Sequence, residues 1–91
     1  MKQTHHAQIR QQQRGIPQAV IDWLLSHGTA EHTHDGAEIL YFDKAARKRL
    51  NRYLGGGPLF SRAEEYLDTY AVIASGKVVT VGHRYSPIHH Q

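Results

Sequence analysis

Histidine and arginine side chains recur near the start of the sequence at a helical spacing. His6, Arg10 and Arg14 are four residues apart, so they lie on one side of a helix. Two arginines can hold a phosphate group, and an imidazole exchanges a proton near neutral pH. Nearby positive charge also favours the neutral imidazole that a general base needs. The pattern predicts phosphate binding with proton transfer. A frayed polar helix at a chain terminus is the alternative.

A second group of polar side chains ends the run from Val78 to Tyr85. Alternation along a strand places His83 on one face and Thr80 and Arg84 on the other. Gly82 lies inside the run and indicates either a β-bulge that redirects a neighbouring side chain or the close approach of a ligand. Thr80, His83 and Arg84 are therefore candidate catalytic residues. A strand that frays into a polar terminus explains the same residues without a function.

The middle of the chain carries a short basic segment, with cations at Lys44, Arg47, Lys48, Arg49 and Arg52. On a helix, Lys44, Lys48 and Arg52 share one face and Arg47 lies beside them. Such a face attracts the phosphate backbone of a nucleic acid, since no acidic residue in the segment neutralises it. Lys44, Arg47, Lys48 and Arg52, with Arg14, are the candidate nucleic-acid-binding residues. The alternative is a solvated helix surface whose cations complement the helix dipole.

Residues typical of helix starts and helix ends indicate the helices that position these side chains. Pro17 suits a first helical turn and Gly28 suits a helix end. Asp43 can cap the basic helix through its carboxylate. Trp23 belongs to a strongly apolar helical segment and is assigned to the core. Helices are expected at residues 5–14, 17–27 and 44–54, with a short helical turn at 61–66.

Two dipeptides, Asp35-Gly36 and Ser75-Gly76, predict tight hairpin turns. The first joins strands expected at residues 30–34 and 38–42, and the second joins strands expected at 69–74 and 77–84. Strands joined by tight turns pair in the antiparallel sense. The sequence therefore predicts a single α+β domain over residues 1–91, with N-terminal helices packed on a four-stranded antiparallel sheet.

The composition narrows the class of protein. The 91 residues carry a formal net charge of +3. They include no cysteine, and this absence excludes a disulfide scaffold and thiolate metal sites. No apolar run is long enough to span a membrane, and Met1 to Arg14 shows no signal peptide, so a cytoplasmic location is expected. His32 and His34 lack a third metal ligand, and residues 55–57 lack the Gly-Lys-Ser/Thr ending of a phosphate-binding loop. No metal or other cofactor is expected.

Three stretches together resemble a family of small bacterial proteins described only as a domain of unknown function. They are His6-Ala7 with Arg10 and Arg14-Gly15-Ile16, Tyr41-Phe42-Asp43-Lys44 with the basic helix, and Val79-Thr80-Val81-Gly82-His83-Arg84. That family is grouped with the barnase–colicin–RelE-like superfamily of ribonuclease toxins. The resemblance implies a RelE- or barnase-like fold with the active site on the exposed face of the sheet. It also implies metal-independent RNA cleavage, often within a toxin–antitoxin pair, by residues matching His6, Arg10, Thr80, His83 and Arg84.

These observations favour an endoribonuclease with RNA, including ribosome-bound RNA, and an antitoxin protein as its expected partners. An imidazole would take the proton of a 2′-hydroxyl, whose oxygen would attack the neighbouring phosphorus, and arginine would stabilise the transition state. A second proton donor, such as the other histidine, would protonate the leaving 5′-oxygen and leave a 2′,3′-cyclic phosphate. A non-catalytic RNA- or ribosome-binding module and a protein-interaction domain are the alternatives. The mechanism depends on one geometric condition, that His6 and the end of the last strand share one pocket.

Overall fold

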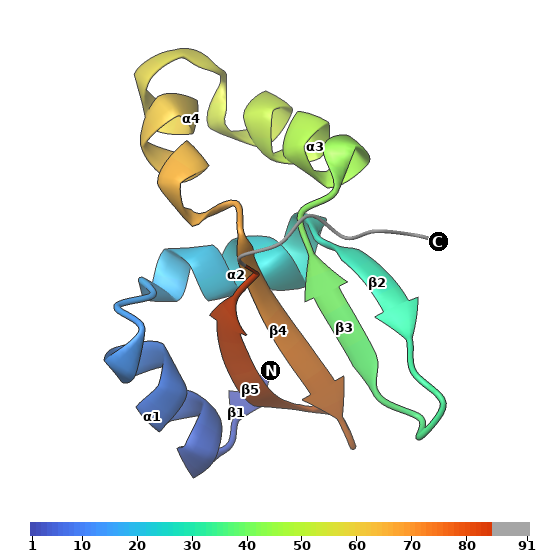
Figure 1. Ribbon diagram of the computed structural model, residues 1–91. Coiled ribbons are helices and arrows are strands. Elements are labelled where there is room, and N and C mark those ends of the chain that lie inside the picture. Colours follow the sequence, from blue (N-terminus) through green and yellow to red (C-terminus); the bar gives the residue numbers. More distant parts are fainter. Residues whose placement is uncertain (85–91) are drawn as a thin grey trace.

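The computed structural model describes residues 1–84 (Figure 1). Its helices are α1 (His5–Gln13), α2 (Gln18–His27), α3 (Lys44–Leu54) and α4 (Gly57–Ala63), followed by a 3-10 turn at Glu64–Tyr66. Its strands are β1 (Lys2–Gln3), β2 (Thr29–His32), β3 (Glu38–Tyr41), β4 (Thr69–Ala74) and β5 (Lys77–His83). Within the described residues, no helix is both long enough and apolar enough to cross a membrane.

The strands form one five-stranded sheet in the order β1-β5-β4-β3-β2. Neighbours from β2 to β5 are antiparallel, whereas β1 pairs with β5 in parallel, with Lys2 opposite Lys77. The predicted α+β class is confirmed. The predicted four-stranded antiparallel sheet is corrected to a five-stranded mixed sheet. The sequence does not reveal β1, because a strand of two residues has no alternation of apolar and polar positions to display.

The helices cover one face and one end of the sheet. Figure 1 shows α2 behind the strands, α1 beside β5, and α3 and α4 beyond the end of the sheet. The core lies between the sheet and these helices and includes Ala7, Val20, Ile21, Leu24, Leu40, Leu50, Ala71, Ile73, Val78 and Val81. We call the other side of the sheet the open face. The strand register places there the rows Thr29–Tyr41–Tyr70–Gly82 and Glu31–Ile39–Val72–Thr80.

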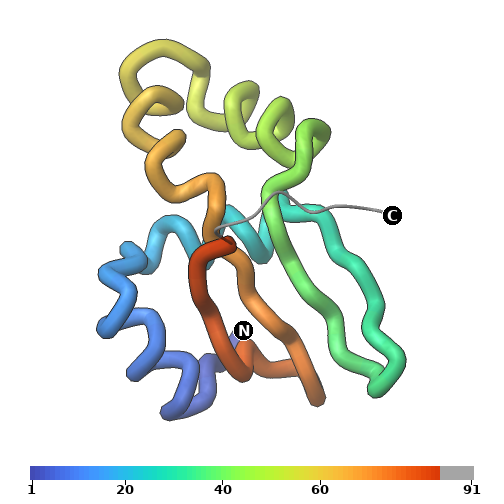
Figure 2. Tube along the Cα trace, viewed as in Figure 1, coloured from blue at the N-terminus to red at the C-terminus, as the bar shows by residue number. Residues whose placement is uncertain are grey.

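Thr4 fixes the start of α1 against β5. Its hydroxyl accepts a hydrogen bond from the N–H of Ala7 at 3.1 Å and so caps the helix. The N–H of Thr4 donates to the carbonyl of Val78 at 2.9 Å, and its hydroxyl donates to the carbonyl of Val79 at 3.3 Å. The helix then runs along β5, and Figure 2 shows the blue N-terminal segment beside the red last strand.

A β-bulge interrupts the pairing of β4 with β5. Val72 lies opposite Thr80 but Ile73 lies opposite Val78, so Val79 is the extra residue. The bulge explains why Val78 and Val81 both belong to the core, although simple alternation separates them. Of the two alternatives for Gly82, the β-bulge at this position is therefore excluded, because Gly82 continues the ladder opposite Tyr70.

Gly82 leaves room for the ring of Tyr70. A Cβ atom at position 82 would lie 2.9 Å from Cε1 and 3.0 Å from the hydroxyl oxygen of Tyr70. Real Cβ atoms essentially never approach so closely. The group that closely approaches Gly82 is thus the Tyr70 side chain, which lies on the open face.

Candidate functional site

Asp43 anchors the basic helix α3 to the sheet. Its carboxylate accepts hydrogen bonds from the N–H of Ala46 at 2.8 Å and from the hydroxyl of Thr29 at 2.7 Å. Burial opposes ionisation of Asp43, but these hydrogen bonds and the charge of Arg49 outweigh it, so the pKa lies below its ordinary value of 3.8. The predicted cap is confirmed, and α3 has a fixed orientation relative to β2.

The cations of α3 divide into two groups, according to whether their side chains hydrogen-bond to the rest of the protein. Arg47 donates from Nε to the carbonyl of Phe42 at 3.3 Å. Arg49 donates from Nε to the carbonyl of His27 at 3.1 Å and from Nη2 to the hydroxyl of Thr29 at 3.1 Å. These two arginines therefore hold α3 in place.

Lys44, Lys48 and Arg52 form the second group of α3 cations. All three are exposed, and none of their side chains makes a hydrogen bond or ion pair within residues 1–84. They recur every four residues, so they span roughly 12 Å along one side of the helix at 1.5 Å per residue. We call these three residues the basic face. Its charges are available to an external anion.

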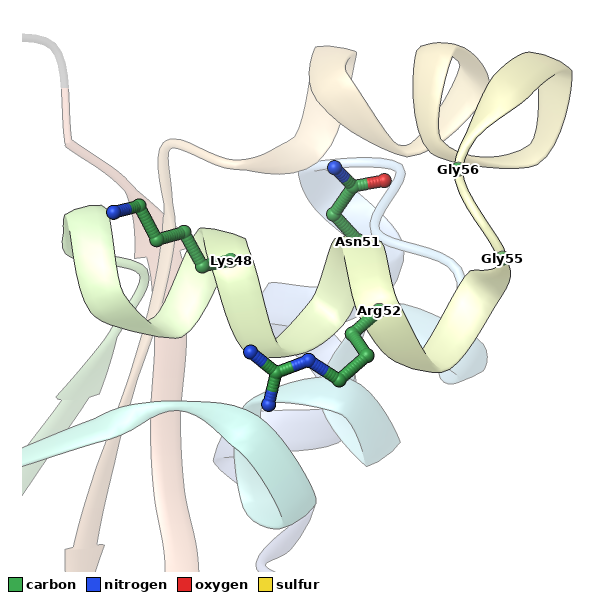
Figure 3. Close-up of a pocket in the computed structure, with 5 residues that line it drawn as sticks. All are labelled: Lys48, Asn51, Arg52, Gly55 and Gly56. Atoms are coloured by element: carbon green, nitrogen blue, oxygen red, sulfur yellow. The ribbon is translucent and has the colours of Figure 1, made fainter.

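A concavity of about 410 Å³ lies at the C-terminal end of the basic face. Lys48, Asn51, Arg52, Gly55 and Gly56 line it. Figure 3 shows the three side chains spreading out from the last turns of α3, with the two glycines in the segment that leaves the helix. Gly55 ends the helix with a left-handed φ of 77°, and Gly56 follows with a φ of 69°. The hollow combines two cations, an amide and a backbone without side chains.

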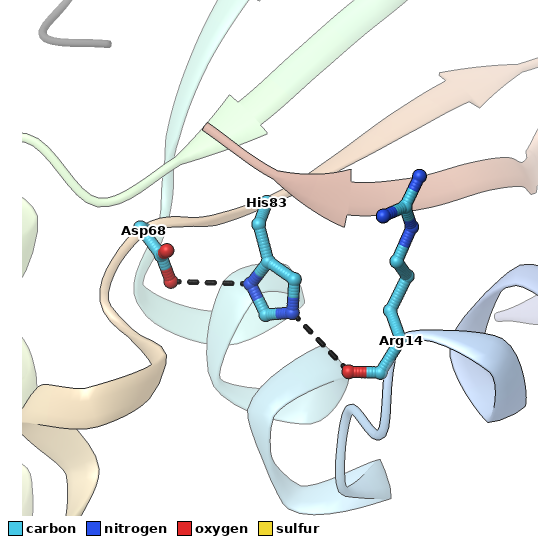
Figure 4. Close-up of polar contacts among 3 residues, drawn as sticks. All are labelled: Arg14, Asp68 and His83. Carbon is cyan, nitrogen blue, oxygen red and sulfur yellow. Dashed lines mark hydrogen bonds and ion pairs between the residues drawn. The ribbon is translucent and has the colours of Figure 1, made fainter. Parts of the chain in front are cut away.

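His83 lies on the helix side of the sheet and binds two different elements (Figure 4). Its Nδ1 lies 3.2 Å from Oδ1 of Asp68, and its Nε2 lies 3.3 Å from the backbone carbonyl oxygen of Arg14. The N–H of Arg84 also donates to the carbonyl of Asp68 at 2.6 Å. Both ring nitrogens therefore face acceptors of the protein, and the imidazole links the end of α1 to the segment before β4.

His6 and His83 lie at opposite ends of α1. The helix starts beside Val78 and Val79, through Thr4, and ends where the Arg14 carbonyl meets His83. The eight residues from position 6 to 14 cover about 12 Å of helix. The first helix and the last strand do lie together, as the mechanism requires. Position 6 nevertheless lies about two helical turns before the Arg14 carbonyl that meets His83, with Arg10 on the turn between them.

Arg84 and Thr80 lie on the open face, across the sheet from α1. The guanidinium carbon of Arg84 lies 4.6 Å above the ring centre of Tyr41, which is a cation–π contact. Within residues 1–84, Nη1 of Arg84 is buried and has no hydrogen-bond partner. Burial and the nearby carboxylates of Glu31 and Asp43 raise the pKa of Tyr41, and Arg84 opposes that effect. The five residues predicted to be catalytic are thus divided between two faces of the sheet.

Asp68 and Tyr41 are contact residues that the sequence reasoning did not select. Asp68 lies 15 positions before its partner His83, and Tyr41 meets Arg84 only because β3 and β5 flank β4. Neither pairing has a spacing that local sequence could show. Comparison with protein-family models, with curated proteins and with solved structures finds no match to this chain.

Proposed function

We propose that the protein binds RNA through the basic face of α3. The observation that carries the proposal is the division among the exposed α3 cations. Arg47 and Arg49 hydrogen-bond to the protein, whereas the side chains of Lys44, Lys48 and Arg52 have no partner among residues 1–84. Cations without an internal partner are the groups that neutralise phosphates and release their counterions. The hollow beside Lys48 and Arg52 gives a phosphate a concave surface in which to lie.

RNA is preferred to DNA because of the resemblance to ribonuclease toxins described above. The basic face itself recognises a phosphate backbone, which both nucleic acids share. Binding is therefore expected to be tight at low salt and largely independent of base sequence. Direct competition between RNA and DNA oligonucleotides of the same sequence tests the preference.

The experiment measures binding of a labelled single-stranded RNA at several salt concentrations. Each phosphate contact to a single strand contributes a slope of about 0.7 in log K against log salt. The double variant Lys48→Ala and Arg52→Ala is expected to lower the slope by about 1.4 and to weaken binding at low salt. The matched control is Lys2→Ala with Lys77→Ala, which removes two exposed cations that pair across β1 and β5.

The control separates a binding site from a general effect of net charge. Both double variants lose the same formal charge, but Lys2 and Lys77 lie at the other end of the sheet from α3 (Figure 1). A slope that falls equally in both variants, or an RNA that is not retained even at low salt, would contradict the proposal.

Metal-independent RNA cleavage is the second candidate function, and one observation favours it. Nη1 of Arg84 is buried and has no hydrogen-bond partner in the described part of the chain, and an anionic oxygen would satisfy such a group. Placed beside a phosphodiester, Arg84 would stabilise the charge of the pentacoordinate transition state, with Thr80 on the same face as a hydrogen-bonding group. His83 faces the other side of the sheet, so it would transfer a proton only if Nε2 released the Arg14 carbonyl and the ring turned towards a substrate at the end of β5.

Cleavage is tested by incubating the protein with RNA in EDTA and identifying the 3′ ends. A 2′,3′-cyclic phosphate is the expected product, and a substrate with a single 2′-deoxy group at the cleaved position should survive. Arg84→Ala is expected to slow cleavage about 100-fold or more, while RNA binding through α3 persists. Absence of cleavage by the wild type would remove this function and leave RNA binding intact. Cleavage by His6→Ala and His83→Ala variants at the wild-type rate would exclude these two histidines as the general base.

A further inference from the structure

The imidazole of His83 lies between two groups that accept hydrogen bonds. Its Nδ1 is 3.2 Å from a carboxylate oxygen of Asp68, and its Nε2 is 3.3 Å from the carbonyl oxygen of Arg14 (Figure 4). A backbone carbonyl has no proton to donate, and an ionised carboxylate has none either. Each contact is therefore a hydrogen bond only when the ring nitrogen carries the hydrogen.

The neutral form of an imidazole cannot make both of these hydrogen bonds at once. It has one N–H group and one nitrogen with a lone pair. In either tautomer, one ring nitrogen would direct its lone pair at the lone pairs of an oxygen, which repels it. The imidazolium has an N–H on each nitrogen and satisfies both acceptors. Its hydrogen bonds are also stronger, because the donor is charged. The geometry around His83 thus suits the doubly protonated ring.

The charged groups around His83 act in opposite directions. Asp68 favours the imidazolium, although its side chain is 43% exposed and water screens part of its charge. The ring of His83 is only 16% exposed, which disfavours a positive charge. The guanidinium of Arg14 also opposes it, but Figure 4 shows that side chain extending away from the Arg14 carbonyl. Arg84 lies on the open face, and Thr69, opposite His83 on β4, is uncharged.

The contact from Nε2 fixes the C-terminal end of α1. The start of this helix is held separately, by the hydrogen bonds of Thr4 to β5. Arg14 is the last residue of the helical turn, and Gly15 follows it with a left-handed φ of 63°. We call the contacts from Asp68 through the imidazole to the Arg14 carbonyl the His83 link. It joins the end of α1 to β5 and to the segment before β4.

We propose that the His83 link is a pH-dependent contact, which closes when the imidazole is doubly protonated and opens when Nε2 loses its proton to water. The proton leaves Nε2 because Nδ1–H faces the carboxylate of Asp68, which is the stronger acceptor. The closed link binds one more proton than the open one, so a rise in pH favours opening. An imidazole exchanges its proton between about pH 5 and pH 8, which is where the change is expected.

The link restricts what His83 can do chemically. A general base needs a free lone pair, and Nε2 has none while it donates to the Arg14 carbonyl. A closed link and a basic Nε2 therefore exclude each other. The proposal for the link itself depends neither on RNA binding nor on cleavage.

The test follows amide hydrogen exchange of the full chain by NMR between about pH 5 and pH 8. Protection is expressed relative to the intrinsic exchange rate at each pH, which removes the ordinary effect of pH. The N–H groups of Arg14 and Ile16 bond to carbonyls of α1 and report on its end. Their protection is expected to fall about tenfold as the pH rises, as loss of one hydrogen bond would produce. The N–H of Gly56, which bonds to the end of α3, is the internal reference and should not change.

Three variants assign the change to the link. His83→Gln cannot take up a proton, so protection at the end of α1 should no longer depend on pH. Asp68→Asn removes the carboxylate that favours the imidazolium, so the transition should move to lower pH. The matched control is Glu38→Gln, which removes one negative charge at the other end of the sheet, opposite Ile73. This control should leave the transition where it is.

Nitrogen NMR of the His83 ring gives a second, direct measurement on the wild type. Both ring nitrogens should carry hydrogen at the acid end of the range, and Nδ1 alone at the alkaline end. A ring with a single hydrogen at the acid end would overturn the proposal. So would protection of Arg14 and Ile16 that does not change with pH, or that changes equally in His83→Gln. Thermal unfolding shows that each variant is folded, and the ring measurement decides the question if His83→Gln is not.

Discussion

Replacement of Asp43 by alanine removes the contact that orients the basic helix. The change deletes the N-cap of α3, which is worth about 1 kcal/mol, and the charged acceptor of the Thr29 hydroxyl, worth about 1.5 kcal/mol. The free energy of unfolding at pH 7 should therefore fall by roughly 2–3 kcal/mol. With a urea m-value of about 1 kcal/mol/M for a small domain, the unfolding midpoint should fall by about 2 M or more.

The effect of this replacement should depend on pH. The pKa of Asp43 in the folded state lies below its ordinary value of 3.8. The ionised carboxylate therefore stabilises the fold fully above the unfolded-state pKa, and this stabilisation is lost as the pH falls through the lower folded-state value. The difference in stability between wild type and Asp43→Ala should be constant from pH 7 to about 5 and should shrink below about pH 4.

Asp43→Asn separates the hydrogen bond from the charge. Asparagine caps helices as well as aspartate does, so this variant should be more stable than Asp43→Ala at every pH. The difference between the two variants should not change with pH, since neither side chain titrates. Urea unfolding between pH 3 and 7, followed by circular dichroism, measures all three proteins. An Asp43→Ala protein as stable as wild type at pH 7, or a difference that persists unchanged at pH 3, would refute the reasoning.

Three further changes give distinct expectations. Gly82→Ala should destabilise the fold by about 1–3 kcal/mol through its clash with Tyr70, and thermal unfolding should show a smaller loss when Tyr70 is already alanine. Arg49→Lys keeps the charge but loses the paired contacts, so unfolding should become easier by about 1 kcal/mol while the salt dependence of RNA binding is retained. His83→Ala should cost about 1–2 kcal/mol by breaking the contacts to Asp68 and the α1 carbonyl; an unchanged urea midpoint would show that this link contributes no stability.

Most helices and strands could be predicted from the sequence, because interactions between residues close in sequence determine where they begin and end. Asp43 caps α3 as expected, and Gly55 ends that helix in the left-handed conformation. The strand β1 was missed because pairing with β5, and not any pattern in two residues, makes it a strand. The extra residue at Val79 was missed because a bulge is decided jointly by two strands.

The candidate site was less predictable than the fold because it depends on which face each side chain reaches. The cationic segment could be found from spacing alone. The hydrogen bond from Arg49 to the His27 carbonyl could not be predicted, since 22 positions separate the two residues. The separation of His6 from His83 follows from the direction in which α1 runs along β5. That direction is set by a long-range hydrogen bond which the sequence does not display.

The hydrogen bond from Thr4 to Val79 joins residues 75 positions apart. The first helix consequently has no sheet to pack on until the last strand has been synthesised and has left the ribosome. During translation the side of α1 that faces β5 stays unpacked, whereas the β2–β3 hairpin can form early from neighbouring residues. Closing so distant a contact is an entropic barrier, so folding should be slow for a chain of this size, with docking of the N-terminal segment as its final step.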